Sequence, residues 1–218
     1  TMLAFVTSDV AISKDMLNEV IHEVVDDTFN MVSVDGDTST NDMLTLMCNG
    51  LAQNNEITQK DENYQCFKKA LMYICTCLSQ AIAKDGEGAT KLLTCNVLHA
   101  KTKKDAKIVA KSVITSSLLK AAMFGEDANW GRIFCAIGYS DADYDIQKID
   151  VDFKSKKGKI CVCQNGGGYP FSEEEAAQIL SEDEIEIIID LHDGDDQATA
   201  WGCDLTYDYV KINGDYRT

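Results

Sequence analysis

Thr1 has the clearest capacity for covalent chemistry in this chain of 218 residues. A hydroxyl is a weak nucleophile near neutral pH and needs a base beside it. A free α-amino group on the same residue, with a pKa of about 7.7–8.0, could take the hydroxyl proton directly or through one water. The apolar run 2–7 predicts a buried strand, and a core strand at the second residue indicates a chain that once continued upstream. Cleavage before Thr1 would create the amine, whereas loss of an initiator methionine is the simpler alternative.

Two polar segments could line a binding site. Residues 35–42 read Asp-Gly-Asp-Thr-Ser-Thr-Asn-Asp, which favours a loop capped by its own side chains over a polar wall beside a pocket. In residues 85–91, Gly86 and Gly88 would let the backbone approach a ligand closely, and Glu87 lies between them. A lone glutamate in a glycine turn is usually just solvated. The functional alternative is a counter-charge for an amine or a proton acceptor.

The tail 208–218 carries two further candidates. Its tyrosines and apolar residues predict a packed, ordered terminus against the usual fraying of chain ends. Asn213 and Thr218 could form hydrogen bonds in a site, or they could only close the fold.

Metal and cofactor signatures are weak. The nine cysteines are odd in number, sit mostly in apolar runs and include C-x-C but no C-x-x-C spacing. Without a histidine close in sequence they predict no metal site, and free thiols point to a reducing cytoplasm. The histidines, His22, His99 and His192, are isolated from any serine or cysteine elbow, so a histidine-based triad is poorly supported. We expect no cofactor.

The elements that must position these residues follow from periodicity and turn signals. Helical patterns cover 13–27, 61–84, 105–123 (one or two helices), 129–137 and 172–181. Strand patterns cover 2–7, 29–34, 43–48, 91–101, a hairpin over 149–164, and an antiparallel pair formed by 184–191 and 198–205. Strands in pairs with helices between them favour an α/β (α+β) layered sandwich over a strictly alternating parallel fold. We expect residues 1–218 to form one main catalytic domain, with a smaller C-terminal lobe as an open alternative.

Charge and hydropathy exclude some classes of protein. The formal net charge is −16, which opposes nucleic-acid binding, although its simplest role is solubility. No stretch approaches the roughly 20 apolar residues that span a bilayer, and the start lacks the basic region of a signal peptide. We therefore expect neither a nucleic-acid nor a membrane partner.

Five segments together carry a family resemblance: TMLAFVTSD, FNMVSVDGDTSTND, DGEGATK, AAMFGEDANWGRI and AWGCDLTYDYVKINGDYRT. Over the whole chain the sequence resembles the β chain of the ornithine acetyltransferase family of arginine biosynthesis, also called glutamate N-acetyltransferase. The resemblance implies autocatalytic cleavage, an αββα sandwich like that of N-terminal-nucleophile enzymes, and an α2β2 heterotetramer with the α chain of the same precursor. It implies that Thr1 is the nucleophile, that Thr1, Glu87, Asn213 and Thr218 bind substrate, and that the oxyanion hole lies on the α chain.

The implied reaction is ping-pong transfer of an acetyl group from N2-acetyl-L-ornithine to L-glutamate through an acetyl-Thr1 ester, with acetyl-CoA as a further acetyl donor in some members. The nearest alternative is an N-terminal-nucleophile amidohydrolase or aminopeptidase that uses the same Thr1. A non-catalytic binding subunit is the alternative from another class.

Overall fold

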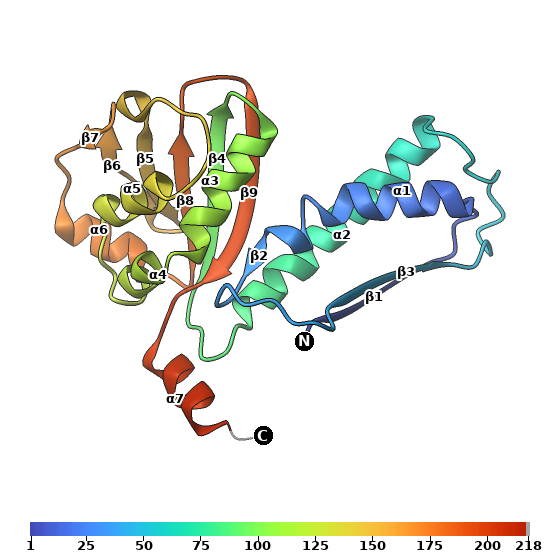
Figure 1. The fold of residues 1–218 in the computed structure, drawn as a ribbon, viewed down its shortest axis with the longest axis horizontal. Helices are drawn as coiled ribbons and strands as arrows, with labels where there is room; N and C mark the ends of the chain where they lie inside the picture. The colour runs from blue at the N-terminus through green and yellow to red at the C-terminus, as the bar shows by residue number, and fades with distance from the viewer. Residues whose placement is uncertain (217–218) are drawn as a thin grey trace. The chain divides into compact units, whose positions relative to one another are not determined.

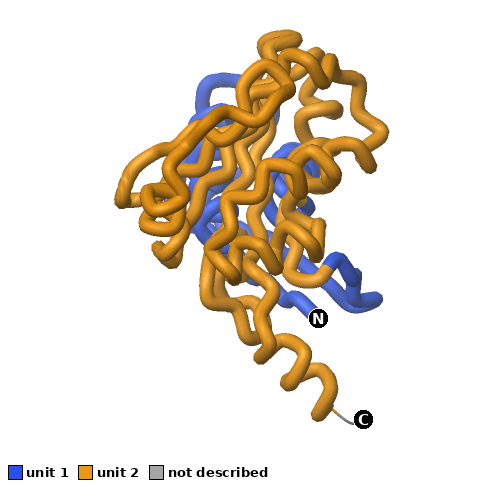
Figure 2. Tube along the Cα trace, turned by 90° about the vertical axis from the view of Figure 1, so that its left-hand side faces the viewer, with its two compact units in different colours: residues 1–30, 36–78 blue, residues 31–35, 79–218 orange. Residues whose placement is uncertain are grey.

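The computed structural model describes residues 1–216, so the predicted binding residue Thr218 lies outside the described residues. The chain divides into two compact units, which Figure 2 distinguishes by colour. The N-terminal unit comprises Thr1–Asn30 and Gly36–Leu78, and the C-terminal unit comprises Met31–Asp35 and Ser79–Thr218.

In the N-terminal unit, two helices pack with a small parallel sheet. Helix α1 (Lys14–Val25) begins where predicted, because the Ser13 side chain accepts a hydrogen bond from the backbone N–H of Met16. Strands β1 (Leu3–Ser8) and β3 (Met43–Cys48) pair in parallel. With α2 (Glu62–Lys84), which continues into the C-terminal unit, they enclose a core of buried residues. This core consists of Val6, Val20, Val24, Ile57, Tyr64, Leu71 and Cys75.

The prediction of a buried first strand is confirmed for the strand and wrong for its burial. Within β1 only Val6 is buried, whereas Leu3 and Phe5 are each 60% exposed. The physical reason is the period of two in a strand, because successive side chains point to opposite faces of the sheet. One face of the β1–β3 pair meets the core, and the other presents Leu3, Phe5, Met43 and Met47 to solvent.

The C-terminal unit contains a mixed sheet of seven strands in the order β2-β9-β4-β8-β5-β6-β7 (Figure 1). Its strands are β2 (Val32–Ser33), β4 (Leu92–Ala100), β5 (Asp150–Ser155), β6 (Gly158–Gln164), β7 (Gly167–Gly168), β8 (Glu184–Asp190) and β9 (Asp196–Cys203). The protein is therefore a mixed α/β structure. The predicted hairpin over 149–164 is confirmed by the antiparallel β5–β6 pair.

The predicted pairing of 184–191 with 198–205 is wrong. Strand β4 lies between β8 and β9, pairing in parallel with the first and antiparallel with the second. All three strands carry apolar residues suited to the sheet interior. Strand β4, which comes far earlier in the chain, therefore pairs with one edge of β8 and with one edge of β9. The strand predicted over 29–34 is also shorter, since Phe29–Met31 forms a 3-10 helix (η1) and only β2 joins the sheet.

Helices cover one face of this sheet. They are α3 (Lys103–Thr115), α4 (Ser117–Phe124), α5 (Trp130–Gly138) and α6 (Glu173–Leu180), and a short 3-10 helix, η2 (Ile146–Lys148), precedes β5. Helix α3 packs on β4 and β9, and α6 packs on β5 and β6. The buried residues Ile185, Ile187 and Ile189 alternate along β8 toward the core, as the period of a strand requires.

The described tail is ordered as predicted but is not packed as predicted. Residues Tyr207–Asp215 form helix α7, which contains no buried residue. Thr206 caps this helix by accepting from the backbone N–H of Tyr209, so local hydrogen bonding accounts for the helix. Among residues 1–216, no helix is long and apolar enough to cross a membrane.

Candidate active site

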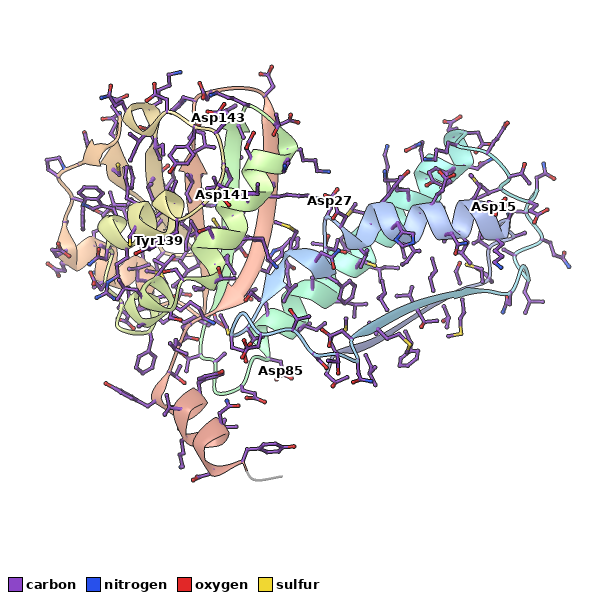
Figure 3. The ribbon with its side chains drawn as sticks, in the orientation of Figure 1. Asp15, Asp27, Asp85, Tyr139, Asp141 and Asp143 are labelled. Carbon is purple, nitrogen blue, oxygen red and sulfur yellow. The ribbon has the colours of Figure 1, made fainter. Side chains whose placement is uncertain are left out.

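The Glu87 loop joins the end of α2 to β4, directly after Asp85, which is labelled in Figure 3. Gly88 has a φ of +68°, a left-handed conformation that a residue with a side chain rarely adopts. A Cβ added at Gly88 would lie 2.7 Å from the backbone nitrogen of Tyr209. This glycine thus allows the loop to lie directly against the start of α7.

Asp204 holds the loop from the C-terminal end of β9. Its Oδ1 accepts hydrogen bonds from the backbone N–H groups of Thr90 at 2.8 Å and Lys91 at 3.0 Å. Its Oδ2 accepts from the Thr90 hydroxyl at 2.5 Å. Since Asp204 is only 3% exposed, these hydrogen bonds supply the partners that its buried charge requires.

Thr206 fastens the same loop a second time. Its hydroxyl donates to the carbonyl oxygen of Gly88 at 2.6 Å while it accepts the capping N–H of α7. One side chain therefore fixes both the loop that carries Glu87 and the helix that carries Asn213.

Glu87 and Asn213 are brought together by this arrangement. The amide Nδ2 of Asn213 donates to Glu87 Oε2 at 2.7 Å and to the Tyr209 carbonyl oxygen at 3.0 Å. Both side chains belong to exposed residues of the C-terminal unit. The pair offers an exposed, oriented carboxylate, which is suited to holding a substrate ammonium group.

Val34 and Asp35, which come earlier in the chain than the Glu87 loop, are held by residues that follow it. The Tyr209 hydroxyl donates to Asp35 Oδ2 at 3.1 Å, and the buried Lys120 ammonium donates to the carbonyl oxygen of Val34. A Cβ at Gly86 would lie 2.8 Å from Cys203 Sγ. Burial raises the pKa of the Cys203 thiol, so near neutral pH this side chain packs as a neutral group.

Thr1 lies in the N-terminal unit, where the segment predicted to be a self-capped loop contacts it. Thr1 Oγ1 lies 2.9 Å from Ser39 Oγ. The next residue is also held, because the backbone N–H of Met2 donates to Asp42 Oδ1 at 2.8 Å. Ser39 also accepts from the Asn41 N–H at 3.2 Å, so the local capping exists beside the contact with Thr1.

The sequence singled out Glu87, Asn213 and the segment of Ser39, whereas Asp204 and Thr206 lay within the motif of residues 200–218 without being singled out. These two residues lie more than a hundred positions from the loop they hold, separated by 114 residues for Asp204–Thr90 and 118 for Thr206–Gly88. The strand predicted over 198–205 included Asp204, whereas β9 ends at Cys203, so the sequence did not indicate that this aspartate leaves the strand to hold a loop.

A cavity of about 430 Å³ lies elsewhere in the C-terminal unit, between the end of α2 and strands β4 and β8. Lys84 and Glu184 line it and form an ion pair at 2.7 Å. None of the described residues that line it is among those predicted to bind substrate.

Comparisons with known proteins agree with the motifs. Residues 1–218 match the model of the ArgJ family. The chain is 52% identical over 218 residues to the arginine biosynthesis bifunctional protein ArgJ of Caldanaerobacter subterraneus subsp. tengcongensis, covering 54% of that protein. It is 54% identical to ArgJ 1 of Clostridium acetobutylicum, covering 53% of that protein. The chain thus spans about half the length of the curated relatives it matches.

A solved structure supports the same relationship. The crystal structure of the arginine biosynthesis bifunctional protein ArgJ of Bacillus halodurans superposes with a TM-score of 0.94 at 45% sequence identity, covering 99% of this chain and 100% of that one. This protein belongs to the ArgJ family.

Proposed function

We propose that this chain carries the nucleophile of an acetyltransferase of arginine biosynthesis, which moves an acetyl group from N2-acetyl-L-ornithine to L-glutamate. The observation that carries the proposal is the match to the ArgJ family over residues 1–218. The relatives at 52% and 54% identity are named as bifunctional proteins of arginine biosynthesis, and acetyl-CoA is the donor that we propose for a second activity.

Thr1 is the proposed catalytic residue, with its α-amine as base. As Thr1 Oγ1 attacks the acetyl carbonyl carbon, its proton moves to the amine. The C–N bond then breaks, the proton passes to the leaving nitrogen of ornithine, and the acetyl group remains as an ester on Oγ1. The contact of 2.9 Å with Ser39 supports a fixed position for this hydroxyl.

The second half of the reaction regenerates Thr1. The neutral amine of glutamate attacks the ester carbonyl carbon and gives a proton to the Thr1 amine. The C–O bond breaks, Oγ1 regains its proton, and N-acetyl-L-glutamate leaves. One amide replaces another, so the exchange requires neither ATP nor a cofactor.

Glu87, Asn213 and Thr218 are the proposed substrate-binding residues. The hydrogen bond of 2.7 Å between Asn213 and Glu87 supports an oriented carboxylate for the side-chain ammonium group of acetylornithine. Thr1 belongs to the N-terminal unit and this pair to the C-terminal unit. We propose that residues 1–218 together form one main catalytic domain.

An α chain from the same precursor is the proposed partner, in an α2β2 assembly that supplies the oxyanion hole. Two observations support a partner. The chain spans 54% of its relative from Caldanaerobacter, and the exposed apolar face formed by Leu3, Phe5, Met43 and Met47 lies on a parallel pair of strands. Parallel sheets are normally covered on both faces. A partner sheet on the β4–β8 face not covered by α3 would complete the proposed αββα sandwich. The free cysteines, together with the biosynthetic role, support a cytoplasmic location.

The test uses the α and β chains expressed separately and assembled, so that variants at Thr1 do not depend on cleavage. N-terminal sequencing first establishes whether the amine of Thr1 is free. Acetyl-labelled acetylornithine with excess glutamate should then give labelled acetylglutamate and ornithine. Labelled acetate without acetylglutamate would indicate an amidohydrolase, and no turnover in the native assembly would favour a binding subunit.

A further inference from the structure

Two of the three histidines of the chain meet at one end of the seven-stranded sheet. His99 is the penultimate residue of β4, and Asp190 is the last residue of β8. Because these strands are parallel neighbours, with Leu98 paired to Asp190, their carboxyl ends lie at the same edge. His192 follows two residues after Asp190 in the turn that leads to β9.

The ligating atoms of these side chains converge. His99 Nδ1 lies 2.8 Å from Asp190 Oδ2, and His192 Nδ1 lies 3.3 Å from Asp190 Oδ1. One ligand atom from each of the three residues lies within 4.8 Å of the other two. A tetrahedral ion with bonds of about 2.0–2.2 Å needs ligand atoms about 3.3–3.6 Å apart, so small rotations of these side chains would admit one.

Asp150 orients one histidine for this role. His192 Nε2 lies 2.9 Å from Asp150 Oδ2, an arrangement that keeps the proton on Nε2 and leaves the lone pair of Nδ1 directed toward Asp190. Carboxylates that hold the outer nitrogen of a histidine in this way are a recurring feature of protein metal sites.

The backbone maintains both histidines in an unfavourable conformation. The φ angles are +51° for His99 and +47° for His192, in the left-handed region that side chains disfavour. The His99 carbonyl oxygen accepts from the Asp193 N–H at 2.8 Å, which fixes the strand end against the turn. Residues with a strained backbone concentrate at binding sites. Here two such residues, His99 and His192, both direct an imidazole nitrogen toward the carboxylate of Asp190.

Lys101, directly after β4, and Lys148, shortly before β5, pair with carboxylates other than Asp190. Asp193 accepts Lys148 at 2.8 Å and Lys101 at 3.3 Å. Lys101 also pairs with Asp143, labelled in Figure 3, at 2.7 Å. Asp190 instead pairs with the two histidines, so its carboxylate faces imidazole nitrogens.

We propose that His99, Asp190 and His192 bind one divalent transition-metal ion of the zinc or cobalt type, with water completing its coordination. Two imidazoles and one carboxylate suit these ions better than magnesium or calcium, which prefer oxygen ligands. The ion fastens the end of β4 to the end of β8 and to the turn before β9. Sequence analysis expected no metal because spacing signatures detect ligands that are close in the chain, whereas His99 and Asp190 are separated by 91 residues.

The experiment uses the assembled enzyme after removal of metal by a chelator. Titration with Co²⁺, followed by visible absorption, and with Zn²⁺, followed by calorimetry, should show one site per chain that involves nitrogen and oxygen ligands. The double variant His99→Gln/His192→Gln should lose this site. Asp150→Asn should weaken binding about 10–100-fold, the usual effect of removing a carboxylate that holds a metal-bound histidine. His22→Gln, on α1, is the matched control and should bind as the native chain does.

Thiols are the main competitor for such ions, since Cys66, Cys77 and Cys135 are exposed. Cobalt bound by cysteine would show intense thiolate charge-transfer absorption and would survive the double substitution. Zinc should also raise the unfolding temperature of the native and His22→Gln enzymes but not of the double variant. Circular dichroism in chelator verifies that the variants are folded. Equal metal binding by the native and double-variant enzymes, or no saturable binding to the native enzyme, overturns the proposal.

Discussion

Asn213 Nδ2 donates a hydrogen bond to Glu87 Oε2 at 2.7 Å and so joins helix α7 to the loop between α2 and β4. The same amide donates to the carbonyl oxygen of Tyr209, one helical turn earlier. One hydrogen bond thus orients the exposed carboxylate of Glu87, and the other holds the Asn213 amide against the backbone of α7, an arrangement suited to recognising a cation.

Replacing Glu87 tests this role. Glu87→Gln keeps the shape but removes the charge, and the loss of a charged hydrogen bond of about 1.5–3 kcal/mol should lower kcat/KM about 10–100-fold. Asn213→Ala should give a smaller loss in the same parameter. Steady-state kinetics with acetylornithine and with glutamate measure both. Asp85→Asn, two residues away in the same loop region, is the control and should remain near native. Native kinetics for Glu87→Gln would rule out its role in binding.

Asp204 should prove essential to the loop. Asp204→Asn replaces an acceptor of three hydrogen bonds with a group that can donate, so we expect a loss of about 1–3 kcal/mol in the free energy of unfolding. Because the Glu87 loop would loosen, kcat/KM should fall as well. Denaturant unfolding and kinetics measure the two effects. Thr90→Ser retains the hydroxyl and should behave as native, whereas Thr90→Val should reproduce part of the loss. An Asp204→Asn enzyme with unchanged kinetics would mean that the loop positions itself.

Gly88 should tolerate no side chain. Gly88→Ala combines a φ of +68° with a Cβ only 2.7 Å from the Tyr209 nitrogen, so either the loop or α7 must move. We expect destabilisation of about 1–3 kcal/mol, typical of a side chain forced into a packed, strained site. The matched control is Gly214→Ala in α7, where a Cβ meets no atom within 4 Å. That variant should be neutral or slightly stabilising. Thermal unfolding compares them, and equal effects would contradict the close approach.

Glu23 should make the N-terminal unit sensitive to acid. Hydrogen bonds from Lys60 and Lys68 lower the pKa of Glu23 from 4.5 to about 2. A lowered pKa in the folded state means that the stabilisation is complete above the unfolded pKa and is lost as the pH falls from 4.5 toward 2. Because this group is partly exposed, Glu23→Gln should cost about 1 kcal/mol near neutral pH.

The pH dependence of that difference is the measurement. Unfolding of the native and Glu23→Gln proteins should differ near neutral pH and converge near pH 2. The exposed Glu56→Gln variant of the same unit is the control, and no comparable difference is expected for it. A constant difference between native and Glu23→Gln at all pH values would contradict the assignment.

Local signals predicted much of the fold. The N-caps Ser13 and Ser172 mark the starts of α1 and α6, and a long apolar stripe marks α2. A helix forms its hydrogen bonds within its own backbone and buries one face, so these positions follow from the local sequence. Strand pairing depends on distant partners instead. Nothing near 184–205 indicates that β4 separates β8 from β9, and the apolar character of β1 does not reveal that one of its faces stays exposed.

The candidate site divides in the same way. Glu87, Asn213, Asp204 and Thr206 all belong to motifs that stand out along the chain. The contacts of Asp204 and Thr206 with the Glu87 loop, and the meeting of His99 with His192, arise only when distant segments become neighbours. The role of Thr1 in catalysis rests on family resemblance and chemistry and stays a prediction.

The most direct test of the central claim is the intact mass of this chain after the assembled enzyme is incubated with N2-acetyl-L-ornithine in the absence of glutamate. We predict a gain of one acetyl group, mapped by peptide fragmentation to Oγ1 of Thr1, which disappears when glutamate is added and yields N-acetyl-L-glutamate in equal amount. Thr1→Ser should still form the ester, and Thr1→Ala should not. The claim would be contradicted if the native enzyme converted acetylornithine and glutamate to products while no acetyl group ever appeared on Thr1. Full activity of the Thr1→Ala variant would contradict it as well.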